Sequence, residues 1–334
     1  APRLAPEEAT RLIGRLDEAV WARASFSGGF IQRDPHEGQP ATATTEVAFV
    51  ITGHALYVAA RLQDAEAGER RAIMTRRDND GNADRFLVSL DTYGDRRTAY
   101  TFGVTAAGVR LDWYHSIDNE NSRDRSFDPI WTARTAETTD GWTVEMEIPL
   151  SQLRFTAGDD QAWGVNVQRF VASRSEDLFW TAMRRGESGW ASWFGDLTGL
   201  GTLRPRRPVE LMPYVTGSAE RLSPSLVDGA NPYHDGERLQ TRAGLDVKAG
   251  IGSNLTLDVT VNPDFGQVEA DPAIVNLTAF PVFFPERRPF FTEGSRLFTV
   301  NGPDYFYSRR IGGAPRGPAS GDFVDRPANT TLLG

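Results

Sequence analysis

Short runs of apolar residues, many of them alternating with polar ones, follow one another along most of the chain. Alternation with a period of two turns one face of a strand toward a core and the other toward solvent, so it predicts β-strands. The gaps between the runs suit hairpins, and repeated short strands of this kind are typical of a β-sandwich. The predicted strands cover residues 45–51, 56–62, 86–90, 100–105, 109–113, 131–135, 142–148, 162–170 and 178–182.

Helix signals are few. Acidic residues after Pro6 predict one short helix that extends toward Leu16, because negative charge favours the first turn of a helix. Pro149 predicts a helical turn over residues 149–153, since proline is well tolerated at a first helical position. The predicted fold class is all-β.

Glycine and proline concentrate at residues 199–208, where the tryptophan-rich stretch ends. Such punctuation predicts a domain boundary. We expect an antiparallel β-sandwich over residues 1–203 and a second domain over residues 204–334. Its strands are predicted at 209–217, 241–249 and 254–261, followed by a Phe- and Pro-rich segment in which the prolines favour irregular structure.

Charge and composition remove several classes of function. The net charge of −9 argues against sequence-independent binding to nucleic acid, which needs a positive surplus. The absence of cysteine excludes thiolate metal sites and cysteine nucleophiles. No apolar run reaches the roughly 20 residues of a transmembrane helix. The start, Ala-Pro-Arg-Leu, predicts a mature N-terminus left after removal of a signal peptide.

Six longer runs carry a family resemblance. They are Leu16-Asp17-Glu18-Ala19-Val20-Trp21, residues 91–100, residues 145–155, residues 261–272, residues 284–291 and residues 307–312. With these runs the chain resembles bacterial outer-membrane proteins in which a domain like the family 9 carbohydrate-binding module precedes a C-terminal β-barrel. The resemblance implies a location at the cell envelope more firmly than it implies a ligand.

The region after the boundary is short for the barrel that the resemblance implies. It has room for about four to six strands, whereas a single-chain membrane barrel needs at least about 8. We therefore expect an incomplete, barrel-derived set of strands, shortened by processing, gene truncation or disorder. The expected location is the periplasm or the periplasmic face of the envelope, and open strand edges favour a protein partner.

Catalytic signatures are missing from the sequence. There is no phosphate-binding glycine loop, zinc-protease histidine pair or nucleophile elbow, and the four histidines are scattered. Glu145 and Glu147 lie on one face of a predicted strand, which leaves a glycosidase pair as an alternative. The sequence favours a protein that is not an enzyme.

An acidic cluster could bind calcium. Asp78, Asp80, Asn82 and Asp84 surround Gly81 and offer the hard oxygen ligands that Ca²⁺ prefers. A polar turn between strands has the same composition, so both interpretations stay open. The family resemblance also implies structural calcium.

Aromatic and basic residues supply the candidate contacts with a ligand or partner. A sugar hypothesis needs exposed aromatic rings, although aromatic residues are more often part of a core. Basic residues in the Glu-Arg-Arg-Pro run could contact a partner, or they could lie in a solvated turn. The candidates are Trp113, Tyr114, Trp131, Trp180, Trp190, Trp193, Arg287 and Arg288.

Two functions remain. The first is a non-catalytic accessory subunit that docks on a larger envelope assembly, such as a respiratory, photosynthetic or transport complex. The alternative is a carbohydrate-binding module of an outer-membrane protein for glycan binding or uptake.

Overall fold

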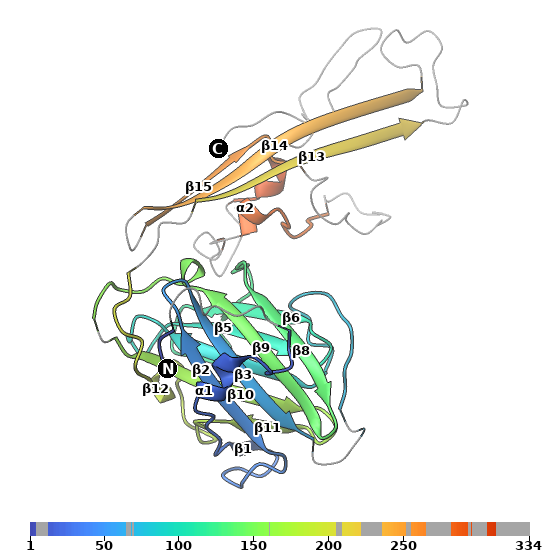
Figure 1. Ribbon diagram of the computed structural model, residues 1–334. Helices are drawn as coiled ribbons and strands as arrows, with labels where there is room; N and C mark the ends of the chain where they lie inside the picture. Colours follow the sequence, from blue (N-terminus) through green and yellow to red (C-terminus); the bar gives the residue numbers. More distant parts are fainter. Residues whose placement is uncertain are drawn as a thin grey trace. The chain divides into compact units, whose positions relative to one another are not determined.

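In the computed structural model, β-strands are the main regular secondary structure of the residues that it describes (Figure 1). The chain divides into two compact units, Ala1–Arg206 and Arg207–Gly334. The structure describes residues 1–4, 13–64, 68, 70–159, 161–204, 209–221, 236–251, 255–264, 282–292, 295 and 306–311.

Antiparallel strands dominate the described residues, which contain two short α-helices, α1 (Ala19–Arg23) and α2 (Pro289–Thr292). The all-β fold class is therefore confirmed. No helix in these ranges has the length and apolar character needed to cross a membrane. The predicted helix after Pro6 falls largely on residues outside the described set.

Two antiparallel sheets form the first unit and confirm the predicted sandwich. The smaller has four strands in the order β2 (Thr45–Ile51), β3 (Ala55–Gln63), β9 (Gly141–Pro149) and β8 (Thr132–Thr138). The larger has eight: β1 (Ile31–Asp34), β11 (Glu176–Phe179), β10 (Trp163–Val171), β4 (Arg85–Asp91), β5 (Ala99–Thr105), β6 (Arg110–His115) and β7 (Arg123–Asp124) in order, with β12 (Gly195–Leu197) also paired to β10.

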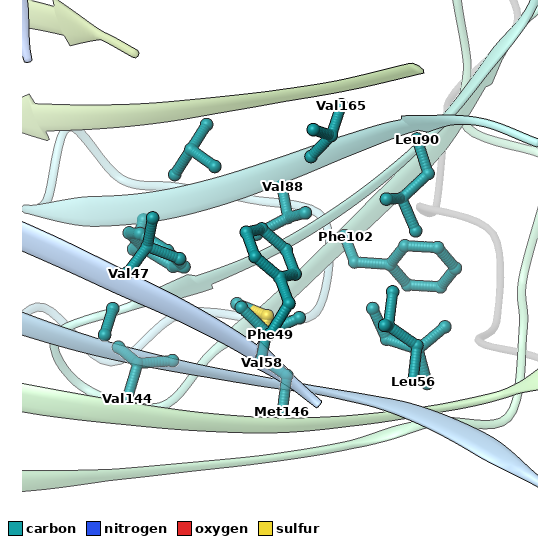
Figure 2. Close-up of a cluster of buried hydrophobic side chains, with 14 of the residues drawn as sticks. Val47, Phe49, Leu56, Val58, Val88, Leu90, Phe102, Val144, Met146 and Val165 are labelled. Carbon is teal, nitrogen blue, oxygen red and sulfur yellow. The ribbon is translucent and has the colours of Figure 1, made fainter. Parts of the chain in front are cut away.

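The core lies between these sheets. Alternate residues of β2, β3 and β9 face alternate residues of β4, β5 and β10, and apolar side chains from both layers interdigitate (Figure 2). Each fully buried side chain of this size contributes about 1.5–3 kcal/mol of hydrophobic stabilisation. The helical turn predicted after Pro149 is present as a 3₁₀ helix, η2 (Leu150–Gln152).

Glu145 fastens the N-terminal segment to the outside of the smaller sheet. Its Oε2 accepts hydrogen bonds from the backbone N–H groups of Ile13, at 3.0 Å, and Gly14, and its Oε1 accepts one from Trp21 Nε1 at 2.5 Å. Burial raises the pKa of this carboxyl. Glu147 accepts a hydrogen bond from Tyr57 Oη at 3.1 Å. Both members of the glycosidase pair considered above thus have structural partners.

The second unit contains one antiparallel sheet of β13 (Val209–Arg221), β14 (Glu237–Ile251) and β15 (Leu255–Val261). The three predicted strands are confirmed, and β13 and β14 are longer than expected. Of the predicted irregular segment, the structure describes residues 262–264, 282–292 and 295, and residues 282–292 contain α2.

The turn between β8 and β9 depends on Gly141. A Cβ added there would lie 2.0 Å from the backbone oxygen of Leu62, which cannot move without breaking the β3–β9 ladder. We expect Gly141→Ala to lower the free energy of unfolding by about 1–3 kcal/mol, the usual cost of overpacking. Urea denaturation measures this change in the free energy of unfolding. Gly53→Ala is the control because a Cβ at Gly53 meets nothing within 4 Å. Equal stability of the two variants would contradict this account.

Candidate functional site

The two edges of the eight-stranded sheet meet over its outer face, the face turned away from the core. Strands β1 and β7 stand at opposite ends of the sheet, so in a flat sheet they would lie roughly 30 Å apart. Arg33 of β1 nevertheless bonds Glu120, in the loop between β6 and β7, with 2.5 Å between Nη1 and Oε2. The sheet and the β6–β7 loop therefore curl around the outer face.

An arginine–carboxylate cluster, defined as Arg33, Arg85, Glu120, Arg123 and Asp177, occupies this meeting point. Arg33 also donates to Asp177 Oδ2 at 2.7 Å, and Arg123 pairs with Glu120 at 3.5 Å. Burial opposes the charge on Arg33, but its bonds to both carboxylates outweigh that effect and raise its pKa. Side chains in the cluster keep between 12% and 31% of their surface exposed, so they are accessible from solvent.

Aromatic rings support the guanidinium groups. The Cζ atom of Arg33 lies 4.4 Å from the centre of the Phe179 ring, and that of Arg123 lies 4.8 Å from the Trp113 ring. Arg85 lies 4.1 Å from the ring of Phe170 and forms an ion pair with Asp80 at 3.2 Å. Stacking of this kind limits the conformations of a long side chain and orients its donors before any ligand arrives.

Beneath the cluster, the outer face is polar and buried. Ser89 Oγ and Thr101 Oγ1 lie 2.8 Å apart, and Gln168 donates to Asp177 Oδ1 at 2.6 Å. Burial raises the pKa of Asp177, although the bonds from Gln168 and Arg33 oppose that shift. Buried polar groups of this kind need partners, and here they find them on neighbouring strands.

His115 ties the β6–β7 loop to the same face. Its Nε2 accepts a hydrogen bond from Trp113 Nε1 at 2.8 Å, so Nδ1 carries the proton and donates to Asn119 O at 3.1 Å. Burial lowers the pKa of His115 to about 4, which keeps the ring neutral at neutral pH.

A second loop closes over His115. Asp118 Oδ1 accepts bonds from the backbone N–H groups of Trp190, at 2.6 Å, and Ser192, at 3.1 Å. Burial works against its charge, yet these bonds lower the pKa of Asp118. The Trp190 ring lies 5.8 Å from the His115 ring, and its buried Nε1–H finds no acceptor among the described residues.

Two predicted contact residues, Trp113 and Trp190, thus come together around His115. Both are 4% exposed, so the expectation that they offer open rings for a sugar is wrong. Strand alternation turns the neighbouring Tyr114 toward the other face of the sheet, where its ring lies 4.9 Å from that of Tyr100.

The remaining predicted tryptophans lie elsewhere. Trp131 is a core residue whose Nε1 donates to Asp112 Oδ2 at 3.1 Å, so its expected exposure is wrong too. Trp180 is half-buried because it stacks against Phe30 and Phe49. Trp193 belongs to η3 (Ala191–Trp193), is half-buried, and donates from Nε1 to Ser188 O at 3.2 Å.

Arg288 is fully buried, which corrects the expectation of a contact patch there. Its Nε and Nη2 donate to the two oxygens of Glu286 at 3.0 and 2.8 Å, and Nη1 donates to Ile311 O at 2.8 Å. Burial would raise the pKa of Glu286, but the bonds from Arg288 and Ser308 lower it to about 2. The neighbouring Arg287 is half-buried, and its backbone N–H bonds Glu286 Oε1 at 3.0 Å.

The acidic cluster forms a turn whose side chains take separate partners. Asp78 Oδ1 accepts from the backbone N–H of Asp112 at 2.9 Å, Asp80 pairs with Arg85, and Asp84 Oδ1 accepts from Ala172 N at 2.7 Å. Asn82 has a positive φ, as turns require. No three His, Cys, Asp or Glu residues in the described ranges are arranged to hold a metal ion. Calcium binding by these residues stays a prediction.

Sequence reasoning missed Arg33, Arg85 and Asp177. Charged residues on short strands look like ordinary solvent-facing positions, and nothing local marks them as partners. Their meeting depends on sheet curvature, for which the sequence offers no signal.

The lowered pKa of His115 predicts that the stability of the fold depends on pH. Its pKa of about 4 in the folded chain lies below the ordinary value of about 6.5, so the unfolded chain takes up the proton first as pH falls. Stability should fall between pH 6.5 and 4, by roughly 3 kcal/mol in full. We expect His115→Gln to remove that dependence in denaturation curves recorded across this range. His54→Gln, at an exposed position, should retain it. If the wild-type chain, His115→Gln and His54→Gln had the same pH profile, His115 would not be the source of this pH dependence.

Comparison with known proteins identifies the family that the sandwich matches. Residues 14–198 match the family described as Carbohydrate family 9 binding domain-like, and residues 205–333 match Domain of unknown function (DUF5916). No curated protein matches the chain.

Similar solved structures include two family 9 carbohydrate-binding modules of Caldicellulosiruptor kristjanssonii. One, in complex with cellotriose, is 15% identical, with 69% of this chain and 99% of that chain covered and a TM-score of 0.42. The other, with glucose, is 16% identical, with 61% and 96% covered and a TM-score of 0.41.

The first match spans more than half of the 334 residues and covers the sandwich described above. It favours the carbohydrate-binding alternative over the accessory subunit of a respiratory, photosynthetic or transport complex. The chain belongs to the carbohydrate family 9 binding domain-like family.

Proposed function

We propose that the first unit is a non-catalytic carbohydrate-binding module and that its glycan contacts the arginine–carboxylate cluster. The observation that carries this proposal is the joint placement of partly exposed charged groups and aromatic rings where the sheet edges meet. Membership of the family supports it.

The cluster has the hydrogen-bonding groups that sugar hydroxyls need. Arginine presents several N–H donors in a fixed fork, while Glu120 and Asp177 present acceptors. Because each hydroxyl both donates and accepts, neighbouring hydroxyls on one sugar ring can bond both kinds of group. Pre-oriented groups also lose little conformational entropy on binding, which favours affinity.

The same geometry favours binding over hydrolysis. A glycosidase needs one carboxylate to protonate the leaving oxygen and another to attack or activate water. Arg33 bonds both Glu120 and Asp177, so its guanidinium lies between the two carboxylates.

Arg123 is the most exposed arginine of the cluster, so it offers the cleanest test. We expect the whole chain to bind at least one member of a glycan panel that includes cellotriose, and Arg123→Gln to weaken that binding about 10-fold, as loss of a charged hydrogen bond does. Isothermal titration calorimetry measures both. Arg97→Gln makes the same charge change on an exposed turn and should bind normally. If the wild-type chain bound no glycan of the panel, the proposal would be wrong.

We also propose that the second unit lies against lipid at the cell envelope, with the first unit outside the cytoplasm. The supporting observation is the strict alternation of its sheet. Cross-strand neighbours such as Leu211 and Val247 share one face, and Val215 and Leu239 on that face are 73% and 82% exposed. A continuous apolar face of this kind marks a surface for lipid or protein. Docking on an envelope protein complex remains a prediction.

Lipid association can be measured by flotation with vesicles of zwitterionic phosphatidylcholine, whose zero net charge removes net electrostatic attraction. We expect the chain to float with the vesicles, and Val215→Asp to reduce the bound fraction severalfold by placing a charge on the apolar face. Thr216→Asp changes the adjacent residue on the polar face of the same strand and should bind as the wild-type chain does. Equal loss in both variants would contradict a lipid-facing role.

A further inference from the structure

A strap, defined as residues 181–192, leads from β11 into η3 and is fastened at both ends. At its start, Asn166 Nδ2 of β10 donates to Thr181 O at 2.8 Å, and the Thr181 N–H donates to Asn166 Oδ1 at 3.0 Å. At its end, the N–H groups of Trp190 and Ser192 bond the Asp118 carboxylate described above. The strap therefore has its root on the larger sheet and its second fastening on the β6–β7 loop.

Between these two ends, the strap is held by polar contacts at the surface. The Arg185 N–H donates to Glu37 Oε1 at 2.9 Å, and the Arg185 side chain pairs with Asp34 while both remain about half exposed. Exposed ion pairs contribute little to stability. Residues 184–188 are all exposed, and Gly186 and Gly189 have positive φ angles of 86° and 118°. A segment that buries so little surface can open locally while the rest of a domain stays folded.

The Trp190 ring at the end of the strap packs against the supports of two cluster arginines. Its centre lies 6.0 Å from that of the Phe179 ring and 5.8 Å from that of the His115 ring. Phe179 lies under the guanidinium of Arg33, and His115 accepts the hydrogen bond of the indole that lies under Arg123. One ring thus links the strap to both sides of the arginine–carboxylate cluster.

Closure of the strap leaves one polar group unsatisfied. Trp190 is 4% exposed, and its Nε1–H meets no acceptor among the residues that the structure describes. A donor that loses water without gaining a partner costs free energy, and opening of the strap would return this donor to water. The cost opposes the hydrogen bonds to Asp118 and so lowers the free energy needed for opening.

We propose that the strap opens and closes while the sandwich stays folded, and that Trp190 is a positioning residue that keeps Arg33 and Arg123 stacked when the strap is closed. Opening withdraws the ring from between Phe179 and His115, so both supports gain freedom to move. The strap would thereby regulate the cluster. This regulation rests on the proposed function of the cluster, whereas the opening can be measured without a glycan.

Hydrogen exchange of the whole chain, read by mass spectrometry, measures the opening. After correction for intrinsic rates, the strap should exchange at least 10-fold faster than β10. Asp118→Ala removes the acceptor of two N–H groups and should speed exchange of the strap about 10-fold further, with β10 unchanged. Glu187→Ala, at an exposed position of the strap, should exchange as the wild-type chain does. If the strap exchanged no faster than β10 in the wild-type chain and in Asp118→Ala, the opening would be overturned.

The unsatisfied donor can be tested with an isostere. Replacement of Trp190 by β-(3-benzothienyl)alanine keeps the shape of the ring and removes the N–H, so exchange of the strap should slow about 10-fold. The same replacement at Trp113 is the control, because it removes the N–H that bonds His115 and should not slow the strap. Faster exchange after replacement of Trp190 would overturn the assigned cost, because it would show that the N–H has an acceptor in the closed state.

Nuclear magnetic resonance of the chain labelled with ¹⁵N-arginine measures the stacking of Arg33 and Arg123. The ring current of an aromatic side chain shifts the signals of a guanidinium stacked on it, and Arg→Lys variants assign these signals. Asp118→Ala should move both toward the values of unstacked arginine. Arg61, whose Cζ lies 3.8 Å from the centre of the Phe26 ring, should keep its shift. Unchanged signals of the two cluster arginines in a chain whose strap exchanges faster would overturn the positioning role.

A binding measurement separates the strap from the proposed function of the cluster. Where a glycan of the panel binds the wild-type chain, Asp118→Ala should weaken that binding severalfold. Equal binding by both chains would overturn regulation by the strap and leave the cluster as a binding site. If no glycan binds, the proposed function is wrong, and the exchange and resonance measurements still decide whether the strap opens and whether it positions the arginines.

Discussion

The outer face of the larger sheet depends on the ion pairs that Arg33 forms. This side chain joins Glu120 and Asp177, which lie 87 and 144 positions away in the sequence, and it packs over Phe179 between them. Removing it would leave the two partly buried carboxylates of Glu120 and Asp177 without the cation that they share, which is destabilising. The loop that carries Glu120 also carries Asp118, which holds the loop around Trp190. One side chain thus links the curvature of the sheet, the position of two loops and the charged cluster.

The polar layer under the cluster has a consequence for ligand recognition. Outer faces of sandwich sheets are usually solvated, but here Ser89, Thr101 and Asn166 are almost fully buried beneath the closing loops. Each is hydrogen-bonded, so the layer is rigid and offers little to a ligand directly. In the proposed binding mode, recognition falls to groups at the rim of this layer. The buried Trp113 would contribute there by supporting Arg123, and not by stacking on a sugar itself.

Period-two patterning was sufficient to predict the sandwich and the three strands of the second unit, because alternation is a local property of the backbone. Pro149 likewise predicted the helical turn that follows it. The contacts at the candidate site could not be predicted in this way. Trp190 looked like a loop aromatic free to meet a ligand, and only the tertiary packing of His115 and Phe194 against it buries the ring. Asp78 and Asp84 accept hydrogen bonds from backbone N–H groups, and composition alone does not distinguish such a turn from one that binds an ion.

The two units also show what alternation leaves undetermined. In the first unit, the apolar members of each strand face a core and the polar ones face outward or find partners. In the second unit the same pattern is inverted: Leu211 and Val215 are exposed, while Asp246 and Thr260 are buried and bonded to each other at 2.6 Å. Buried charge needs compensation wherever it occurs, and in this unit Arg288 and Glu286 supply it for each other. In the lipid contact proposed above, the surroundings would cover the apolar face of the second unit, as the opposing sheet covers the apolar face of the larger sheet in the first.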